Sequence, residues 1–407
     1  SCAITAIFVI YRLAATPGWA NEVEDEERAV ERQQESDGQA SADDGDTGKA
    51  DSAAADDPAQ PAAEPAPLPL SLLGRQVEPG SFATLHWTPD QSFASIATPV
   101  PVLVAHGDKP GPRLCLTAAI HGDELNGIEI VGRLIRSKAI ERIRGTLIAV
   151  PMVNVYGVLN QSRYLPDRRD LNRSFPGSKK GSLAGRLANL FFKEVVSKCD
   201  VGIDLHTGAI HRSNLPQIRA DLDDAAVLEM AKAFGVPVLL NAELRDGSLR
   251  EAASANGVKI LLYEAGQALR YDEFSIRAGV KGIINTMRHL GMLNKSRSKG
   301  HSIERFIARQ SGWVRAPESG FVTHLAQLGD HVEKGDKLAI IADPFGNYLD
   351  SIVSPAEGVV IGKQNIPLTQ EGEAIYHIAY FSEPDTVAEH VELLQDNLLP
   401  QEQDPGL

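Results

Sequence analysis

Apolar residues in the middle of the chain follow two alternating patterns. Short runs rich in β-branched residues have the pattern of buried strands: residues 114–120, 146–153, 201–205, 237–240 and 259–263. The segments between them place apolar residues at helical spacing: residues 125–137, 182–197, 224–234 and 272–290. Strands that alternate with helices predict an α/β fold, in which helices cover both faces of one sheet. We expect this domain to cover residues 67–300.

Beyond residue 300 the pattern changes to short β segments separated by regularly placed glycines. Turn sequences such as Gly329-Asp330 and Gly335-Asp336 separate the first segments, and a second, similar half continues through Gly358. We therefore predict a small all-β domain over residues 301–380. The remaining residues, 381–407, are acidic, and we expect them to form a loosely ordered tail.

The start of the chain divides into an apolar segment and an acidic one. Residues 2–10 form an apolar run that is too short to cross a bilayer as a helix. This pattern predicts a secretory signal peptide over residues 1–20, cleaved after Ala20, with a membrane anchor as the alternative. Residues 21–66 contain few branched or aromatic side chains, so they cannot bury enough apolar surface to fold. We interpret them as a disordered acidic linker, with an interaction arm as the alternative.

The chain has 407 residues, of which 43% are hydrophobic, and this is enough for two or three domain cores. Its net charge of −14 lies in the flanks, because residues 21–66 hold 15 acidic and 3 basic residues, and residues 381–407 hold 7 acidic and no basic ones. The middle of the chain is mildly basic, without the stripe of basic and aromatic residues that a nucleic-acid surface needs. The composition therefore argues against a nucleic-acid partner and fits a small anionic substrate.

Cysteines are rare in this chain. If the signal peptide is removed, Cys2 is lost with it, and only Cys115 and Cys199 remain. Two cysteines cannot form a dense disulfide framework, and the sequence neither requires nor excludes a bond between them.

Residues with metal-ligating side chains follow two of the apolar runs. His121 and Glu124 lie three positions apart where a predicted strand passes into a helix, so both side chains can point at one ion. His206 ends another run, in the sequence Asp-Leu-His-Thr-Gly. Each residue alone is ambiguous, since surface His/Glu pairs and buried histidines are common. Together, two imidazoles and one carboxylate at strand ends predict a metal site, and zinc suits this ligand set.

A further carboxylate, Glu264, follows the run at 259–263. The carboxyl ends of parallel strands meet at one edge of a sheet, so we expect Glu264 close to His121 and His206. We interpret Glu264 as a general base that takes a proton from the attacking water and delivers it to the leaving amine. A carboxylate that caps a loop is the alternative.

Arginines are concentrated in one loop-like segment: Arg163, Arg168, Arg169 and Arg173. A guanidinium group binds carboxylates in a bidentate manner and can stabilise an oxyanion without losing its charge. For Arg168 and Arg169, a solvated basic loop is an equal alternative. For Asn172 and Arg173 we do not give the solvated loop this weight. Arg219, which follows the His206 motif, is a further candidate for a substrate contact.

Four motifs follow one another between residues 80 and 292: His121-Gly-Asp-Glu124, Asp170-Leu-Asn-Arg173 with a nearby Phe-Pro-Gly, Asp204-Leu-His206-Thr-Gly and Tyr263-Glu264-Ala-Gly. In this order they resemble the motifs of the succinylglutamate desuccinylase and aspartoacylase family. This family belongs to the wider group of zinc-carboxypeptidase-like hydrolases. The resemblance therefore implies a mixed sheet flanked by helices.

The resemblance also implies a role for each residue that matches a motif. It assigns one Zn2+ per chain to His121, Glu124 and His206, and the role of general base to Glu264. Asn172 and Arg173 would hold a carboxylate of the substrate.

The family further places an arginine upstream of the Asp-Leu-Asn-Arg motif, where it polarises the scissile carbonyl. We place this role on Arg163. The spacing between Arg163 and Arg173 is longer than in aspartoacylase, so Arg168 is the rival candidate.

The predicted β domain resembles the barrel-sandwich domains of the biotinyl or lipoyl type. The matching element is the turn at residues 329–336. No lysine lies in the hairpin context that carries an attached cofactor, so we predict no attachment. A lid or a contact in a homo-oligomer is the expected role.

The sequence thus predicts a zinc-dependent amidohydrolase that removes an acyl group from a small N-acylated amino acid or related amide. An exported zinc carboxypeptidase that trims peptides or cell-wall peptides would need the same ligands, and it is the first alternative. A non-catalytic zinc-binding scaffold is the second. The predicted signal peptide implies a periplasmic or secreted protein, and the anchor alternative implies a membrane-attached one.

Overall fold

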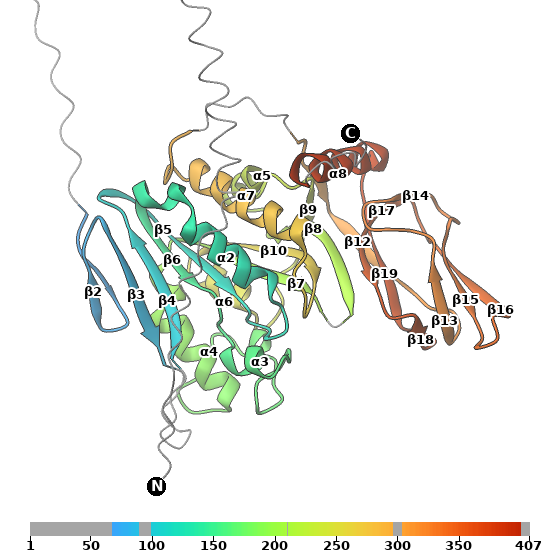
Figure 1. The fold of residues 1–407 in the computed structure, drawn as a ribbon, viewed down its shortest axis with the longest axis horizontal. Helices are drawn as coiled ribbons and strands as arrows, with labels where there is room; N and C mark the ends of the chain where they lie inside the picture. The colour runs from blue at the N-terminus through green and yellow to red at the C-terminus, as the bar shows by residue number, and fades with distance from the viewer. Residues whose placement is uncertain (1–66, 89–98, 210, 296–302, 400–407) are drawn as a thin grey trace, which may run out of the picture. The chain divides into compact units, whose positions relative to one another are not determined.

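The computed structural model describes residues 67–88, 99–209, 211–295 and 303–399 (Figure 1). The predicted signal peptide and the predicted acidic linker, which together cover residues 1–66, lie outside these ranges. Among the described residues, no helix combines the length and the apolar character needed to cross a membrane.

One large mixed sheet forms the centre of the fold (Figure 1). In spatial order its main strands are β12 (Gln310–Arg315), β19 (Ala374–Tyr380), β17 (Gly358–Gln364), β8 (Arg212–Ala220), β10 (Lys259–Gln267), β7 (Val201–Gly208), β5 (Lys109–Ala118), β6 (Arg144–Val150), β4 (Val100–His106) and β3 (Ser81–Trp87). The strands β10, β7, β5 and β6 are parallel to one another. On the two sides of this group, β8 pairs with β10 and β4 pairs with β6, both in the antiparallel direction. The carboxyl ends of the parallel strands therefore share one edge of the sheet.

Helices flank this sheet: α2 (Asn126–Arg136), α3 (Val155–Leu159), α4 (Leu183–Glu194), α5 (Ala225–Phe234), α6 (Leu249–Ala255) and α7 (Glu273–His289). Short 3-10 turns lie between them: η1 (Lys138–Arg142), η2 (Leu171–Arg173) and η3 (Val196–Lys198). Residues of α2, α5 and α7 share one core with Leu116 and Leu205, and residues of α4 and α6 share a second core with Cys115. Because side chains alternate along a strand, His206 points to the opposite face from Leu205.

The alternation of strands and helices that the apolar pattern predicts is confirmed, for example by β7 over the run at 201–205 and by α7 over the segment at 272–290. The prediction missed β8, which lies in the interior of the sheet. This strand contains Pro216, and proline is normally excluded from central strands. In the structure, Leu215 and Pro216 fall where the pairing of β8 with β10 shifts register, so the missing N–H costs no ladder hydrogen bond.

Between residues 306 and 380 the regular elements are β-strands, as the glycine pattern predicts. A separate four-stranded sheet contains β13 (Gly320–His324), β15 (Lys337–Ala342), β16 (Tyr348–Val353) and β18 (Leu368–Thr369). The other strands join the large sheet, because β17 pairs with β8, β14 (His331–Val332) with β17, and β11 (Phe306–Ala308) with β9 (Val238–Asn241). The C-terminal β segment is therefore hydrogen-bonded directly to the main domain. Its role as a lid or oligomer contact stays a prediction.

Two further elements lie at the ends of the described chain. The strands β1 (Leu70–Leu72) and β2 (Arg75–Val77) form a small hairpin. The expectation of a loose tail is wrong for α8 (Pro384–Leu398), which buries Val387, Val391 and Leu394 in the cores. Its apolar residues recur at helical spacing, and this stripe outweighs the acidic composition on which the expectation relied.

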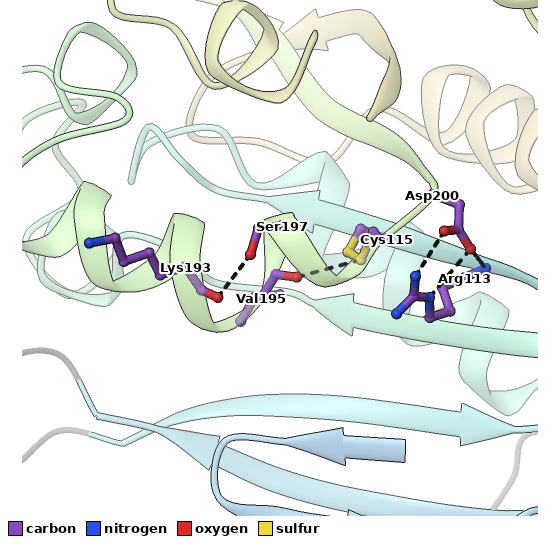
Figure 2. Close-up of a disulfide and its surroundings, with 7 residues drawn as sticks. Arg113, Cys115, Lys193, Val195, Ser197 and Asp200 are labelled. Carbon is purple, nitrogen blue, oxygen red and sulfur yellow. Dashed lines mark hydrogen bonds and ion pairs between the residues drawn. A yellow bond between two sulfur atoms is a disulfide. The ribbon is translucent and has the colours of Figure 1, made fainter. Parts of the chain in front are cut away.

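A disulfide bond joins Cys115 in β5 to Cys199, which lies just before β7 (Figure 2). The two Cα atoms are 5.9 Å apart, and 84 positions separate the cysteines in the sequence. Beside the bond, Arg113 pairs with Asp200, with 2.9 Å between Nη2 and Oδ1. The disulfide thus joins β5 to the segment that leads into the neighbouring parallel strand β7.

Candidate active site

His121, Glu124 and His206 come together at the carboxyl ends of β5 and β7. One ligand atom from each residue lies within 4.8 Å of the others, and all three side chains are buried. Nδ1 of His121 is 2.8 Å from Oε1 of Glu124, and Nδ1 of His206 is 2.8 Å from Oε2. Both imidazoles therefore present the same ring nitrogen to one carboxylate. This cluster could hold a metal ion.

The other ring nitrogen of each histidine contacts a second carboxylate. Nε2 of His206 lies 2.8 Å from Oδ2 of Asp204, and Nε2 of His121 lies 3.2 Å from Oδ1 of Asp170. Carboxylates in this position fix the tautomer and the orientation of metal-binding imidazoles. The hydroxyl of Thr117 donates to Asp204 at 2.6 Å and holds that carboxylate in turn. The donor set and its outer hydrogen bonds thus fit a zinc ion.

Electrostatic interactions in the cluster favour the charged forms of Glu124 and His206. Burial disfavours the charge of Glu124, but the two imidazoles outweigh this effect and hold its pKa well below the usual range. Burial also opposes protonation of His206, yet Asp204 and Glu124 raise its pKa well above the ordinary value. A buried group of this kind is stable only while each charge keeps its partner.

The structure brings Arg163 to this cluster, but not Arg168. Nη1 of Arg163 is 3.3 Å from Oε1 of Glu124, and its Nη2 donates to Asp170 at 2.9 Å. Burial lowers the pKa of Arg163, but Glu124 and Asp170 outweigh this effect and raise it, so the guanidinium stays charged. Arg168 is exposed and has a positive φ of 62°.

The Asp-Leu-Asn-Arg motif forms the turn η2. The Oδ1 atom of Asn172 accepts a hydrogen bond of 2.8 Å from the backbone N–H of Leu249, so this end of the amide is occupied by the start of α6. Arg173 is more exposed. Partial burial lowers its pKa, Asp170 opposes this effect, and the positive charges of Arg245 and Arg163 add to the lowering. Arg173 is therefore close to two other arginines and to Asp170.

Glu264 lies beside the cluster, because it is the direct pairing partner of His206 between the parallel strands β10 and β7. Both carboxylate oxygens have protein partners. Asn214 donates to Oε1 at 2.9 Å, and Nε of Arg219 lies 3.4 Å from Oε2. Arg219, predicted as a substrate contact, thus pairs with the candidate base.

Arg250, at the start of α6, is a residue that sequence reasoning missed. Its side chain is buried, and within the described part of the chain its Nη1 has no hydrogen-bond partner. Burial lowers its pKa, Arg219 adds to this, and Glu264 opposes it. A buried guanidinium with an unused donor is suited to bind an anion. In the sequence, a single arginine in this segment does not indicate a binding residue.

Two imidazoles and a carboxylate at strand ends, beside a further carboxylate and an arginine, form the arrangement of a metallohydrolase site. Residues 110–290 match the family model of the succinylglutamate desuccinylase/aspartoacylase catalytic domain. The N-alpha-acetyl-L-2,4-diaminobutyric acid deacetylase of Halomonas elongata is 30% identical over 302 residues, which are 71% of this chain and 87% of that protein. The chain belongs to the succinylglutamate desuccinylase/aspartoacylase family, as its motifs predict.

Solved structures share the fold. A succinylglutamate desuccinylase/aspartoacylase from Rhodobacter sphaeroides has a TM-score of 0.66 at 24% identity, and the match covers 74% of this chain and 96% of that chain. The ectoine utilization protein EutE (DoeB) from Ruegeria pomeroyi, solved with a bound product, has a TM-score of 0.64 at 26% identity, with coverage of 73% and 94%. These proteins confirm the mixed α/β fold, and the family relationship makes this chain a relative of deacylating hydrolases.

Proposed function

We propose that this protein is a zinc-dependent hydrolase that cleaves the amide bond of an N-acyl amino acid or a related small amide that carries a carboxylate. The observation that carries the proposal is the geometry around Glu124, where two oriented imidazoles and Arg163 converge on one buried carboxylate. Bound by His121, Glu124 and His206, one Zn2+ per chain would polarise the scissile carbonyl and lower the pKa of a water molecule.

The chain's own residues supply the remaining chemistry. Glu264 takes a proton from the attacking water and delivers it to the leaving nitrogen. The charged guanidinium of Arg163 stabilises the negative charge that develops on the carbonyl oxygen. Arg173, the Nδ2 end of the Asn172 amide and the Nη1 donor of Arg250 hold the carboxylate of the substrate.

The relatives suggest which substrates to test first. The Halomonas elongata protein is named for N-alpha-acetyl-L-2,4-diaminobutyric acid, and the family name refers to succinylglutamate and to an acylated aspartate. All these compounds carry a carboxylate beside the amide. We therefore expect this chain to prefer N-acyl amino acids to peptides and to uncharged amides.

The test measures kcat/KM of the zinc-loaded protein on N-acetyl-2,4-diaminobutyrate, N-acetylaspartate, N-succinylglutamate, short peptides and an N-acetyl amine without a carboxylate. We expect the best N-acyl amino acid to exceed the amine by about 100-fold or more, since loss of the carboxylate leaves buried donors unpaired. Faster release of C-terminal amino acids from peptides would favour the carboxypeptidase alternative. A protein that binds zinc but hydrolyses none of these compounds would favour the scaffold.

We also propose that the protein is exported. The disulfide between Cys115 and Cys199 supports this location, because such bonds persist in oxidising compartments and are rare in the cytosol. In a bacterial host, the chain with its N-terminal segment should enter the periplasmic fraction and contain no thiol that reacts after denaturation. A cytosolic protein in which Cys115 and Cys199 both react as thiols would contradict this proposal, and a protein retained in the membrane fraction would favour the anchor.

A further inference from the structure

Asn214 links the candidate base to the C-terminal part of the chain. It lies in β8, which pairs with β10 on one side and with β17 on the other, where Asn214 is the direct partner of Gly362. Its side chain is buried, and Nδ2 donates to Oε1 of Glu264 at 2.9 Å. The amide thus lies between the catalytic carboxylate and a strand of the β segment.

Gly362 provides the space that the Asn214 amide occupies. A Cβ atom at position 362 would lie 3.0 Å from Oδ1 of Asn214 and 3.0 Å from Cβ of His377. Both distances are shorter than ordinary van der Waals contact. The backbone at Gly362 has no positive φ, so the conformation does not require glycine there. The absence of a side chain at this position instead lets the amide reach its observed place.

The second partner of Glu264, Arg219, acts electrostatically on His377 in β19. Burial lowers the pKa of His377 to about 3, and the charge of Arg219 contributes to this shift. His377 is therefore neutral, and its ring stacks on Trp313 of β12 with centroids 4.5 Å apart and planes 10° apart. The uncharged rings of His377 and Trp313 thus pack face to face in the C-terminal strands.

We propose that the C-terminal strands position the general base. Gly362 leaves space for the side-chain amide of Asn214, and this amide holds the carboxylate of Glu264 in place. Asn214 is a positioning residue in this scheme, and the inference rests on the proposed role of Glu264. A base held by two partners from β8 cannot rotate away from the water, and a displacement of about 1 Å can cost about 100-fold in rate. The β segment is then required for turnover without touching the substrate.

A double-mutant cycle tests this chain of contacts. We expect Asn214→Ala to lower kcat by about 10- to 100-fold and to leave KM within about twofold, since the residues that hold the substrate carboxylate are unchanged. Gly362→Ala should lower kcat by about 10-fold, because its methyl group displaces the amide. In the Asn214→Ala background, most of the effect of Gly362→Ala should disappear. Fully additive effects would overturn the inference.

Two more variants separate positioning from general damage. Asn214→Asp keeps the shape of the side chain but replaces the donor with a second carboxylate 2.9 Å from Oε1 of Glu264, so it should also lower kcat. Asn365→Ala is the matched control at the same junction, because it removes the hydrogen bonds to Ser213 and Gln267, of 2.6 and 2.7 Å, and leaves Asn214 in place. It should retain the parental kcat. An equal loss in Asn365→Ala would show that the junction is only structural.

The outcome for Glu264→Gln distinguishes this inference from the proposed function. If Glu264→Gln is fully active, the base assignment fails and the inference fails with it. If Glu264→Gln is inactive while Asn214→Asp, Asn214→Ala and Gly362→Ala keep the parental kcat, only the positioning role is wrong.

Discussion

Replacing Glu264 with glutamine is expected to lower kcat by about 1000-fold, because general acid–base catalysis typically contributes between about 100- and 10,000-fold. Glutamine has the same shape, and its carbonyl oxygen can still accept the hydrogen bond from Asn214. It cannot accept a proton from water at neutral pH. The measurement is kcat on the best substrate from the panel of N-acyl amino acids.

Metal content decides how this loss is interpreted. Glu264 is outside the His121, Glu124 and His206 cluster, so the Glu264→Gln protein should still contain one Zn2+ per chain by elemental analysis. Glu124→Gln is the matched control, since it removes a ligand and should lose both the metal and the activity. Loss of zinc from Glu264→Gln would make Glu264 a ligand. Retention of full activity would remove it from the mechanism.

The sequence could predict that the site residues lie close together, because their positions follow from the order of the strands. His121 follows β5, His206 lies near the end of β7, and Glu264 lies in β10, and these three strands are parallel neighbours in the sheet. Carboxyl ends of parallel strands share one edge, so a sequence pattern that shows the strands also predicts which side chains meet.

The choice between Arg163 and Arg168 could not be made in the same way, because it depends on the path of a loop. The backbone N–H of Leu165 bonds to the carbonyl of Arg169, and that of Arg168 bonds to the carbonyl of Leu165. These bonds close a tight turn with Arg168 near its tip, in solvent. The longer spacing seen in the sequence is therefore taken up by a turn, which leaves Arg163 at the cluster.

The position of β8 in the sheet and the burial of Arg250 could not be predicted from the sequence either. The segment of β8 is polar and contains Pro216, so its local pattern does not resemble a central strand, and its pairing with β10 and β17 decides its conformation. The significance of Asn214 depends on this pairing. The burial of Arg250 results from tertiary packing, which no local feature of the sequence reveals.

Removal of the disulfide is expected to lower the free energy of unfolding by about 4 to 5 kcal/mol, the loop-entropy value for cysteines 84 positions apart. In this account the bond acts on the unfolded chain, whose freedom it restricts. Both cysteines are buried, so the Cys115→Ala/Cys199→Ala protein is the cleaner comparison with the parent, and serine would bury unpaired hydroxyl groups. The measurement is guanidinium unfolding of both proteins, with and without a thiol reductant in the denaturant.

The reductant distinguishes the bond from the packing around it. It should destabilise the parent toward the value of the double-alanine protein and leave the latter unchanged. Asp200→Asn is the local control, because it breaks the neighbouring pair with Arg113, and an ion pair this exposed contributes only about 1 kcal/mol or less. Equal stability of the parent and the double-alanine protein would mean that the bond does not form. Because Cys115 and Cys199 belong to the segments that lead to His121 and His206, the folded double-alanine protein should still bind zinc, and its deficit should appear only in unfolding.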